Sequence, residues 1–207
     1  MKVVAISDTH MRQKDIILPD GDILIHAGDL SLTGTKEEIV NFLMWFSEQP
    51  HEYKIFIAGN HDFMFETRPG EMKSYIPDNV IYLENSGINI DGINIWGSPI
   101  QPTFYDWAFN VDRGAKIKRY WDLIPDNTDI LITHGPPFGK LDGNHNKERV
   151  GCEELALAVA RIRPKYHIFG HIHQGYGQLS DGVTNFINAS LLNEKYIYTN
   201  EPIVFNF

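Results

Sequence analysis

Five short apolar stretches of the chain each end in residues that can bind metal ions or transfer protons. In the clearest case, the stretch 23–27 ends in Gly28 and the carboxylate of Asp29. A short apolar run bounded by turn residues is typical of a buried strand. Because open α/β sheets bind ligands at the carboxyl ends of their strands, we expect Asp29 at such an edge. The residues that end the five stretches are Asp8, His10, Asp29, Asn60, His61, Asp62, His134, His171 and His173.

Most of these side chains are candidate metal ligands. Imidazole together with carboxylate suits first-row ions such as Mn, Fe, Zn, Co or Ni, and the lack of thiolates argues against structural zinc. One ion would need only part of the set. Two ions that share Asp29 would use all of it, and ions about 3.5–4 Å apart commonly act on phosphoryl oxygens. The candidate ligands are Asp8, His10, Asp29, Asn60, His134, His171 and His173.

Taken singly, these residues also have structural explanations. Asp8 or Asp29 alone could be a turn or helix-cap residue, and alternating histidines such as His171 and His173 often lie on a surface strand. Jointly, metal-type side chains at the ends of five apolar strands have no packing explanation. The remaining histidines are interpreted as buried and hydrogen-bonded, although His145 is expected on a loop near the site, and the cysteine is interpreted as a packing residue. These are His26, His51, His145, His167 and Cys152.

The surrounding pattern predicts a β-rich core with helices outside it, of the α/β or α+β class. Thr35 with Glu38 three residues later is typical of a helix start, and this helix should end near Gln49, before Pro50. Asp91-Gly92 predicts a hairpin turn. Further helices are expected at 115–123 and 152–162, and strands near 3–6, 23–27, 55–58, 80–83, 88–90, 93–96, 130–133, 167–169, 176–179, 183–187 and 203–207.

Length and composition limit the class of protein. With 207 residues, 43% of them hydrophobic, the chain is expected to form one domain over 1–207. The net charge of −9 disfavours extended nucleic acid as a partner. One cysteine fits a reducing compartment. The chain enters a strand from Lys2 without a charged leader, and no apolar run reaches membrane-span length. We therefore expect a cytoplasmic protein that does not bind membranes, and the oligomeric state stays open.

The stretch 98–112 is rich in proline and aromatic residues and predicts a long functional loop. Phe104, Tyr105 and Phe109 could stack on a nucleobase or fill a gap beneath the loop, and for Trp107 packing is favoured. Arg113 either holds a phosphate oxygen or bridges carboxylates. The sequence does not decide between these roles.

The ordered motifs resemble those of the calcineurin-like metallophosphoesterases, whose pattern is DxH, GD, GNH followed by D or E, then H and GHxH. Here the motifs are Asp8-Thr9-His10, Gly28-Asp29, Gly59-Asn60-His61-Asp62, His134 and Gly170-His171-Ile172-His173. Gly97-Ser98-Pro99, Trp107-Ala108-Phe109 and His134-Gly135-Pro136-Pro137 are similar to the MPPED-type branch. Some animal members of that branch carry glycine where this chain has His171. The resemblance implies a four-layer α/β/β/α sandwich, in which helices flank two mixed sheets.

The resemblance also implies roles for individual residues. One metal would take Asp8, His10, Asp29 and His173, and the other Asp29, Asn60, His134 and His171. His61 would be the catalytic histidine that protonates the leaving oxygen, with Asp62 as its orienting carboxylate. A hydroxide bridging the two ions, with manganese favoured, would attack phosphorus. Substrate contacts are expected from Asn60, His61, Arg113, Phe109 and Tyr105.

The prediction is therefore a dimetal phosphodiesterase that acts on small nucleotides such as cyclic nucleotides. One alternative is a phosphomonoesterase with the same metal site. The other is a weakly active, metal-dependent nucleotide-binding protein.

Overall fold

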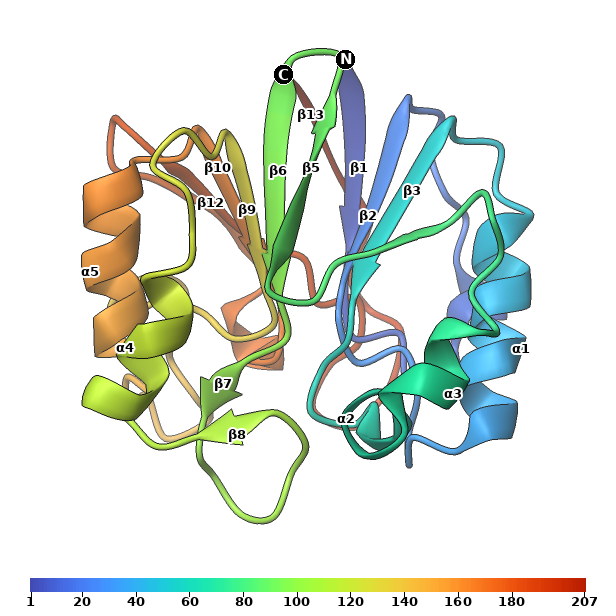
Figure 1. Cartoon of the computed structure of the whole chain (residues 1–207), viewed down its shortest axis with the longest axis horizontal. Helices are drawn as coiled ribbons and strands as arrows, with labels where there is room; N and C mark the ends of the chain where they lie inside the picture. Colours follow the sequence, from blue (N-terminus) through green and yellow to red (C-terminus); the bar gives the residue numbers. More distant parts are fainter.

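A computed structural model describes residues 1–207 as four layers, with two β-sheets between helices (Figure 1). Most neighbouring strands are parallel, and antiparallel strands lie at three of the four sheet edges, so both sheets are mixed. The predicted α/β/β/α sandwich is confirmed. The first sheet has the order β13 (Ile203–Asn206), β1 (Lys2–Ile6), β2 (Ile23–Ala27), β3 (Tyr53–Ile57), β4 (Ile81–Tyr82). The second has the order β11 (Gly177–Ser180), β12 (Asn185–Asn188), β10 (Tyr166–Phe169), β9 (Ile130–Thr133), β6 (Ile93–Ser98), β5 (Ser86–Ile90).

The central strands are buried on both faces, which explains their uninterrupted apolar sequences. Side chains alternate between the faces of a strand, so Val3 and Ala5 of β1 face the second sheet, whereas Val4 and Ile6 face the helices. The layer between the sheets is mainly small and β-branched. Its members include Ile23, Ile25, Ile55, Ile57, Ile130, Ile132 and Ile168.

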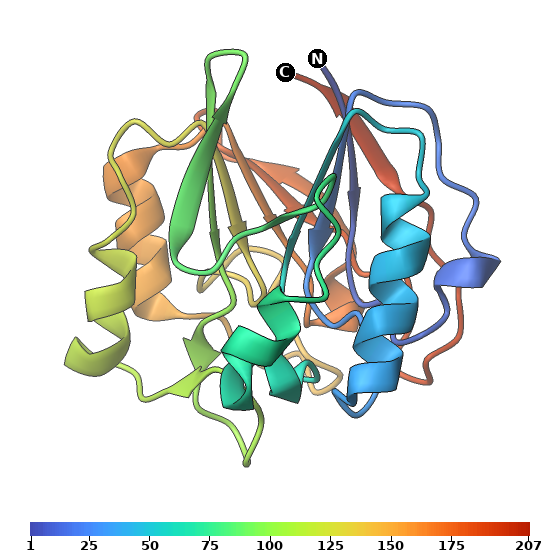
Figure 2. The ribbon, with the colours of Figure 1, turned by 45° about the vertical axis from the view of Figure 1, so that its right-hand side comes forward.

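Three main helices cover the outer faces of the sheets. Helix α1 (Lys36–Ser47) packs on the first sheet, and α4 (Ala115–Trp121) and α5 (Glu153–Ile162) pack on the second (Figure 2). The Thr35 side chain accepts a hydrogen bond from Glu38 N at 3.4 Å, as its capping role predicts. Cys152 caps α5, because its sulfur accepts from Leu155 N at 3.4 Å. None of the helices combines the length and apolar character needed to cross a bilayer.

The hairpin prediction is confirmed, while two other stretches contain short elements that were not predicted. β5 and β6 pair antiparallel, and Asp91 and Gly92 have φ of 48° and 88°, as a type I′ turn requires. Two short helices, α2 (Phe63–Thr67) and α3 (Pro69–Lys73), occupy a stretch for which no helix was predicted. The loop 98–112 contains a short parallel pair, β7 (Gln101–Pro102) and β8 (Asn110–Val111). Short 3-10 turns are η1 (Gln13–Asp15) and η2 (His173–Gly175).

Candidate metal centre

The candidate donors gather where the two sheets meet, at the carboxyl ends of their strands and away from the chain termini (Figure 1). Asp8, His10, Asp29 and Asn60 follow β1, β2 and β3 of the first sheet. The second sheet contributes three histidines after β9 and β10. These are His134, His171 and His173.

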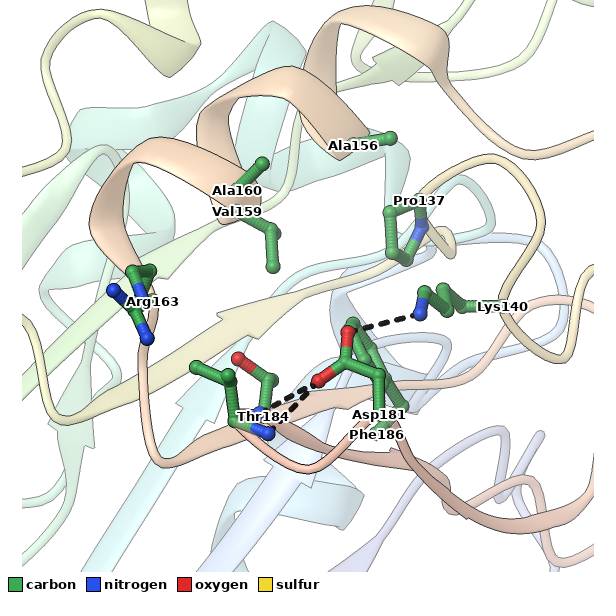
Figure 3. Close-up of a pocket in the computed structure, with 10 residues that line it drawn as sticks. Pro137, Lys140, Ala156, Val159, Ala160, Arg163, Asp181, Thr184 and Phe186 are labelled. Atoms are coloured by element: carbon green, nitrogen blue, oxygen red, sulfur yellow. Dashed lines mark hydrogen bonds and ion pairs between the residues drawn. The ribbon is translucent and has the colours of Figure 1, made fainter.

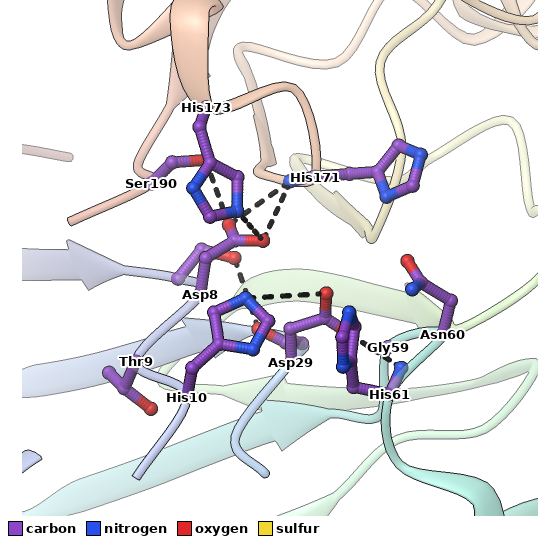
Figure 4. Close-up of polar contacts among 12 residues, drawn as sticks. Asp8, Thr9, His10, Asp29, Gly59, Asn60, His61, His171, His173 and Ser190 are labelled. Atoms are coloured by element: carbon purple, nitrogen blue, oxygen red, sulfur yellow. Dashed lines mark hydrogen bonds and ion pairs between the residues drawn. The ribbon is translucent and has the colours of Figure 1, made fainter. Parts of the chain in front are cut away.

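Asp29 lies between two groups of donors (Figure 4). On one side, His10 Nε2 lies 3.7 Å from Asp29 Oδ2, and His173 Nε2 lies 3.5 Å from Asp8 Oδ1. On the other, His134 Nε2 lies 3.3 Å from the same Asp29 oxygen. A bridging ligand of a two-metal centre needs this central position. Potential ligand atoms lie within 4.8 Å of one another in the groups Asp8–His10–His173, His10–Asp29–His61 and Asp29–His134–His171.

Asn60 completes the second group. Its side-chain oxygen lies 2.9 Å from His134 Nε2, and the His171 ring is centred 5.0 Å from the His134 ring. An amide oxygen and two imidazoles beside a carboxylate suit a divalent transition ion. The sequence-based division of ligands between two ions agrees with this geometry and stays a prediction.

Four of the candidate ligands have a left-handed backbone. The φ angles of Asp8, His10, Asp29 and His171 are 54°, 38°, 58° and 67°. Such conformations cost about 1–3 kcal/mol in non-glycine residues and are concentrated at functional sites. Hydrogen bonds between neighbouring strand ends maintain them, including Asp8 N to Gly28 O at 3.0 Å and His10 N to Asp29 O at 3.1 Å. The backbone is therefore bent to turn these side chains toward one another.

Glycines in the same motifs leave room for the carboxylates. A Cβ on Gly170 would lie 2.0 Å from Asp8 Oδ2, and one on Gly59 would lie 2.3 Å from Asp29 Oδ1. Both distances are far below van der Waals contact. The two glycines are thus required by close packing against the candidate ligands.

Backbone carbonyls set the direction of three histidine rings. Nδ1 of His10, His134 and His173 lies 3.1, 2.9 and 3.0 Å from the carbonyl oxygens of Ser31, Ala27 and Asn193. A carbonyl only accepts, so Nδ1 carries a proton in each ring and Nε2 faces the centre, where it offers a lone pair whenever the ring is neutral. Metal-binding histidines have this arrangement. Nε2 of His10 is also buried without a hydrogen-bond partner, which fits a site built for a cation.

The charges of the centre also fit cations. Burial lowers the pKa of His10 to about 4 and that of His171 to about 3, so both rings are neutral at pH 7. Burial has the same tendency at His134 and His173, but the carboxylates of Asp29 and Asp8 outweigh it and raise each pKa to about 9. In the absence of metal, the protonated rings of His134 and His173 therefore balance the carboxylates of Asp29 and Asp8. Metal binding to these rings would release their protons.

His61 lies beside the centre at the wall of a cleft. Its Nδ1 donates to Leu32 O at 2.6 Å, so Nε2 is the free ring nitrogen. The ring lies 4.6 Å from that of His10 and 4.3 Å from that of Trp107, measured between centroids. Its backbone N–H donates to Asp29 Oδ1 at 2.9 Å.

The predicted role of Asp62 needs correction, because no hydrogen bond joins it to the His61 ring. Its carboxylate instead accepts from backbone N–H groups of Asp29 at 3.0 Å, Ser31 at 3.0 Å and Gly59 at 2.7 Å. The Ser31 hydroxyl adds a bond of 2.6 Å. The side chain turns inward because the loop 29–31 offers several donors there. Asp62 therefore positions the loop that carries Asp29. The same loop continues to Leu32, whose carbonyl oxygen accepts from the His61 ring.

The cleft over the centre has a volume of about 400 Å³ and aromatic walls. The ring centroid of Phe104 lies 5.1 Å from that of His171, and the ring centroid of Tyr196 lies 4.7 Å from that of His10. Trp107, for which packing was favoured, also lines the cleft. Tyr196, Gln174 and Glu194 line it too and were missed by the sequence analysis. Gln174 directly follows His173, but nothing in the local sequence marks Glu194 or Tyr196.

Three predicted substrate contacts lie elsewhere. Phe109 is 5% exposed and belongs to the core. The Arg113 guanidinium donates to the carbonyls of Gly151 and Val150, each at 2.8 Å, and pairs with Glu153, which makes its role structural. Tyr105 is 86% exposed and does not line the cleft. Of the predicted contacts, Asn60 and His61 line the cleft.

Three of the four other histidines match their prediction. His26 pairs with the Thr9 hydroxyl at 3.0 Å, His51 with a carbonyl at 3.0 Å, and His167 with the Thr133 hydroxyl at 2.8 Å. For His145 the prediction of burial was wrong, because this residue is exposed, but it does lie on a loop at the cleft, as expected. Its neighbours in sequence are polar, so its position depended on how the loop 139–149 folds.

Comparisons with known proteins agree with this geometry. Residues 1–175 match the sequence profile described as calcineurin-like phosphoesterase. The chain is 44% identical to Metallophosphoesterase domain-containing protein 1 of Homo sapiens, over 98% of this chain and 70% of that protein. A UPF0046 protein of Caenorhabditis elegans is 41% identical, over 99% of this chain and 74% of its own. One crystal structure, 17% identical, matches with a TM-score of 0.63 over 90% of this chain and 89% of that one, which shows the fold alone. The chain therefore belongs to the calcineurin-like phosphoesterases, a membership that supports a metal-dependent phosphoester hydrolase with a dinuclear centre.

Proposed function

We propose that the protein is a dimetal phosphodiesterase that hydrolyses small nucleotides, with cyclic nucleotides as the first substrates to test. The observation that carries this proposal is the position of Asp29 between two donor groups, beside His61 in an aromatic cleft. One ion would be held by Asp8, His10, Asp29 and His173, and the other by Asp29, Asn60, His134 and His171. Manganese is the first metal to test, because carboxylate, amide and imidazole donors accommodate it.

Two divalent ions, when bound, would lower the pKa of water and neutralise phosphoryl charge. The protein supplies a proton donor and a shaped site. His61 Nδ1 donates to Leu32 O, so the doubly protonated ring would carry its second proton on Nε2 and give that proton to the leaving oxygen, which returns the ring to its neutral form. The Trp107 ring packs against the His61 ring, with the two centroids 4.3 Å apart.

The charges of the cleft favour a diester over a monoester. Apart from the candidate ligands, its charged lining residue is the carboxylate of Glu194, and the lining includes neither lysine nor arginine. A monoester dianion would bring one more negative charge than a diester, without a side-chain cation to balance it. Aromatic walls from Phe104, Trp107 and Tyr196 suit a nucleobase, which stacks on such surfaces.

The test is a comparison of substrates with metal-loaded protein. After chelation and reloading with manganese, kcat/KM is measured on bis-p-nitrophenyl phosphate, p-nitrophenyl phosphate and 2′,3′- and 3′,5′-cyclic nucleotides. We expect the diester to exceed the monoester by at least about tenfold, a difference of about 1.4 kcal/mol in transition-state binding. A monoester preference would instead identify a phosphomonoesterase. Nucleotide binding without turnover would identify a binding protein.

A further inference from the structure

A second cavity, of about 390 Å³, lies on the helix side of the second sheet (Figure 3). It is a groove between α5 and the turn that joins β11 to β12, and it shares no lining residue with the cleft over the metal centre. Its walls are largely apolar. They include Ala156, Val159 and Ala160 of α5 and Phe186 of β12.

The two ends of the groove carry different charges. At one end, Lys140 Nζ pairs with Asp181 Oδ2 at 2.9 Å and lies 4.5 Å from the centre of the Phe186 ring. The other Asp181 oxygen accepts from the N–H groups of Val183 and Thr184, at 3.1 and 2.9 Å. Lys140 is therefore neutralised within the protein, and Asp181 has little capacity to bind anything further.

At the opposite end stands the guanidinium of Arg163, which makes no hydrogen bond or ion pair within the protein (Figure 3). Arg163 ends α5 in a left-handed conformation, with φ of 57°. Helices usually place glycine or asparagine in such a conformation, and an arginine there carries a cost in backbone strain. With Lys140, Asp181 and Arg163 taken together, the lining has a net charge of +1.

We propose that this groove binds a small organic acid with one carboxylate and a compact apolar body. The carboxylate would pair with the Arg163 guanidinium, whose planar fork matches it in two parallel hydrogen bonds. The apolar body would cover Ala156, Ala160 and Val183, which are the accessible apolar residues of the lining. A monoanion balances the net charge, whereas a dianion would leave one negative charge unpaired. The volume falls in the range of small-molecule sites.

Benzoate is a suitable probe, and its neutral counterpart benzamide is the matched control. Each is titrated into the metal-loaded full chain by isothermal titration calorimetry. For a ligand of this size we expect benzoate to bind with a Kd of about 1 mM, and benzamide at least about tenfold more weakly. Equal affinities for the two probes would show that the carboxylate is not recognised and would overturn the proposal.

Three variants test whether benzoate binds in the groove. Arg163→Gly should weaken benzoate by about tenfold or more, and because glycine favours positive φ, this variant should fold. Ala160→Trp should fill the groove and abolish binding. Arg119→Gln, at an exposed arginine of α4 outside the groove, should leave the Kd unchanged. Full binding to Arg163→Gly, as expected if benzoate bound the metal centre instead, would refute the site, whatever the phosphoesterase assay shows.

Discussion

The contacts of Asp62 lead to a prediction that can be worked out from the structure. Its carboxylate accepts from the backbone N–H groups of Asp29, Leu30, Ser31 and Gly59 and from the Ser31 hydroxyl. Asparagine has nearly the same shape but only one acceptor oxygen. If that oxygen keeps the contacts of Oδ2, the amide NH₂ faces the Ser31 N–H, which is then buried without a partner.

An unsatisfied buried N–H costs about 1–3 kcal/mol, and the remaining hydrogen bonds lose the strengthening that a charged acceptor gives. Relief of repulsion offsets part of this cost, because burial and the Asp29 carboxylate raise the pKa of Asp62 to about 6. We therefore expect Asp62→Asn to lower the free energy of unfolding by about 2–3 kcal/mol.

Urea denaturation of metal-free protein measures this change without a contribution from bound ions. The same variant should bind less metal and show a lower kcat per bound metal, because both Asp29 and the carbonyl that holds His61 depend on this loop. Ser31→Ala is the matched control, since it removes one donor and leaves the carboxylate in place, so its effect should stay below about 1 kcal/mol. If the free energy of unfolding of Asp62→Asn lay within about 0.5 kcal/mol of that of the parent protein, or if the variant kept the parent's kcat per bound metal, the positioning role would be refuted.

Three further predictions concern the centre and the core. Asp29→Asn should lose activity and at least one ion, and elemental analysis that found two tightly bound ions would contradict the bridge. His61→Ala should keep both ions but slow hydrolysis by about 10²–10⁴-fold for an alkoxide leaving group and far less for nitrophenolate, whereas equal slowing would exclude a general acid. Burial lowers the pKa of His167 to about 3, so below pH 6.5 only the unfolded state gains its proton and stability falls. Between pH 8 and pH 5, the free energy of unfolding of His167→Gln, measured by urea titration, should therefore fall by about 2 kcal/mol less than that of the parent protein. Parallel pH profiles for the two proteins would refute this.

The sequence was most informative where function depends on strand ends. Because parallel strands present their carboxyl ends at one edge, the residues after five apolar runs were expected together, and Asp29 and His134 do lie 3.3 Å apart. The alternation of Val3 and Val4 between two layers could not be foreseen, because both residues are apolar. It follows from burial on both faces.

Side chains on loops were harder to place. Arg113 was assigned two roles, and only the folded contact with the segment 150–153 decides between them. Tyr196 lies more than a hundred residues from His10 in sequence, yet their rings are in contact. Such contacts depend on how distant loops pack, and no local pattern encodes them.

The division of donors between two sheets has a consequence for the order of folding events. Neither sheet alone carries enough candidate ligands for both ions, since Asp8, His10, Asp29 and Asn60 follow the first and the three histidines follow the second. A chain in which only one sheet had formed would offer half a centre. Uptake of the second ion during refolding would therefore report the moment at which the two halves dock.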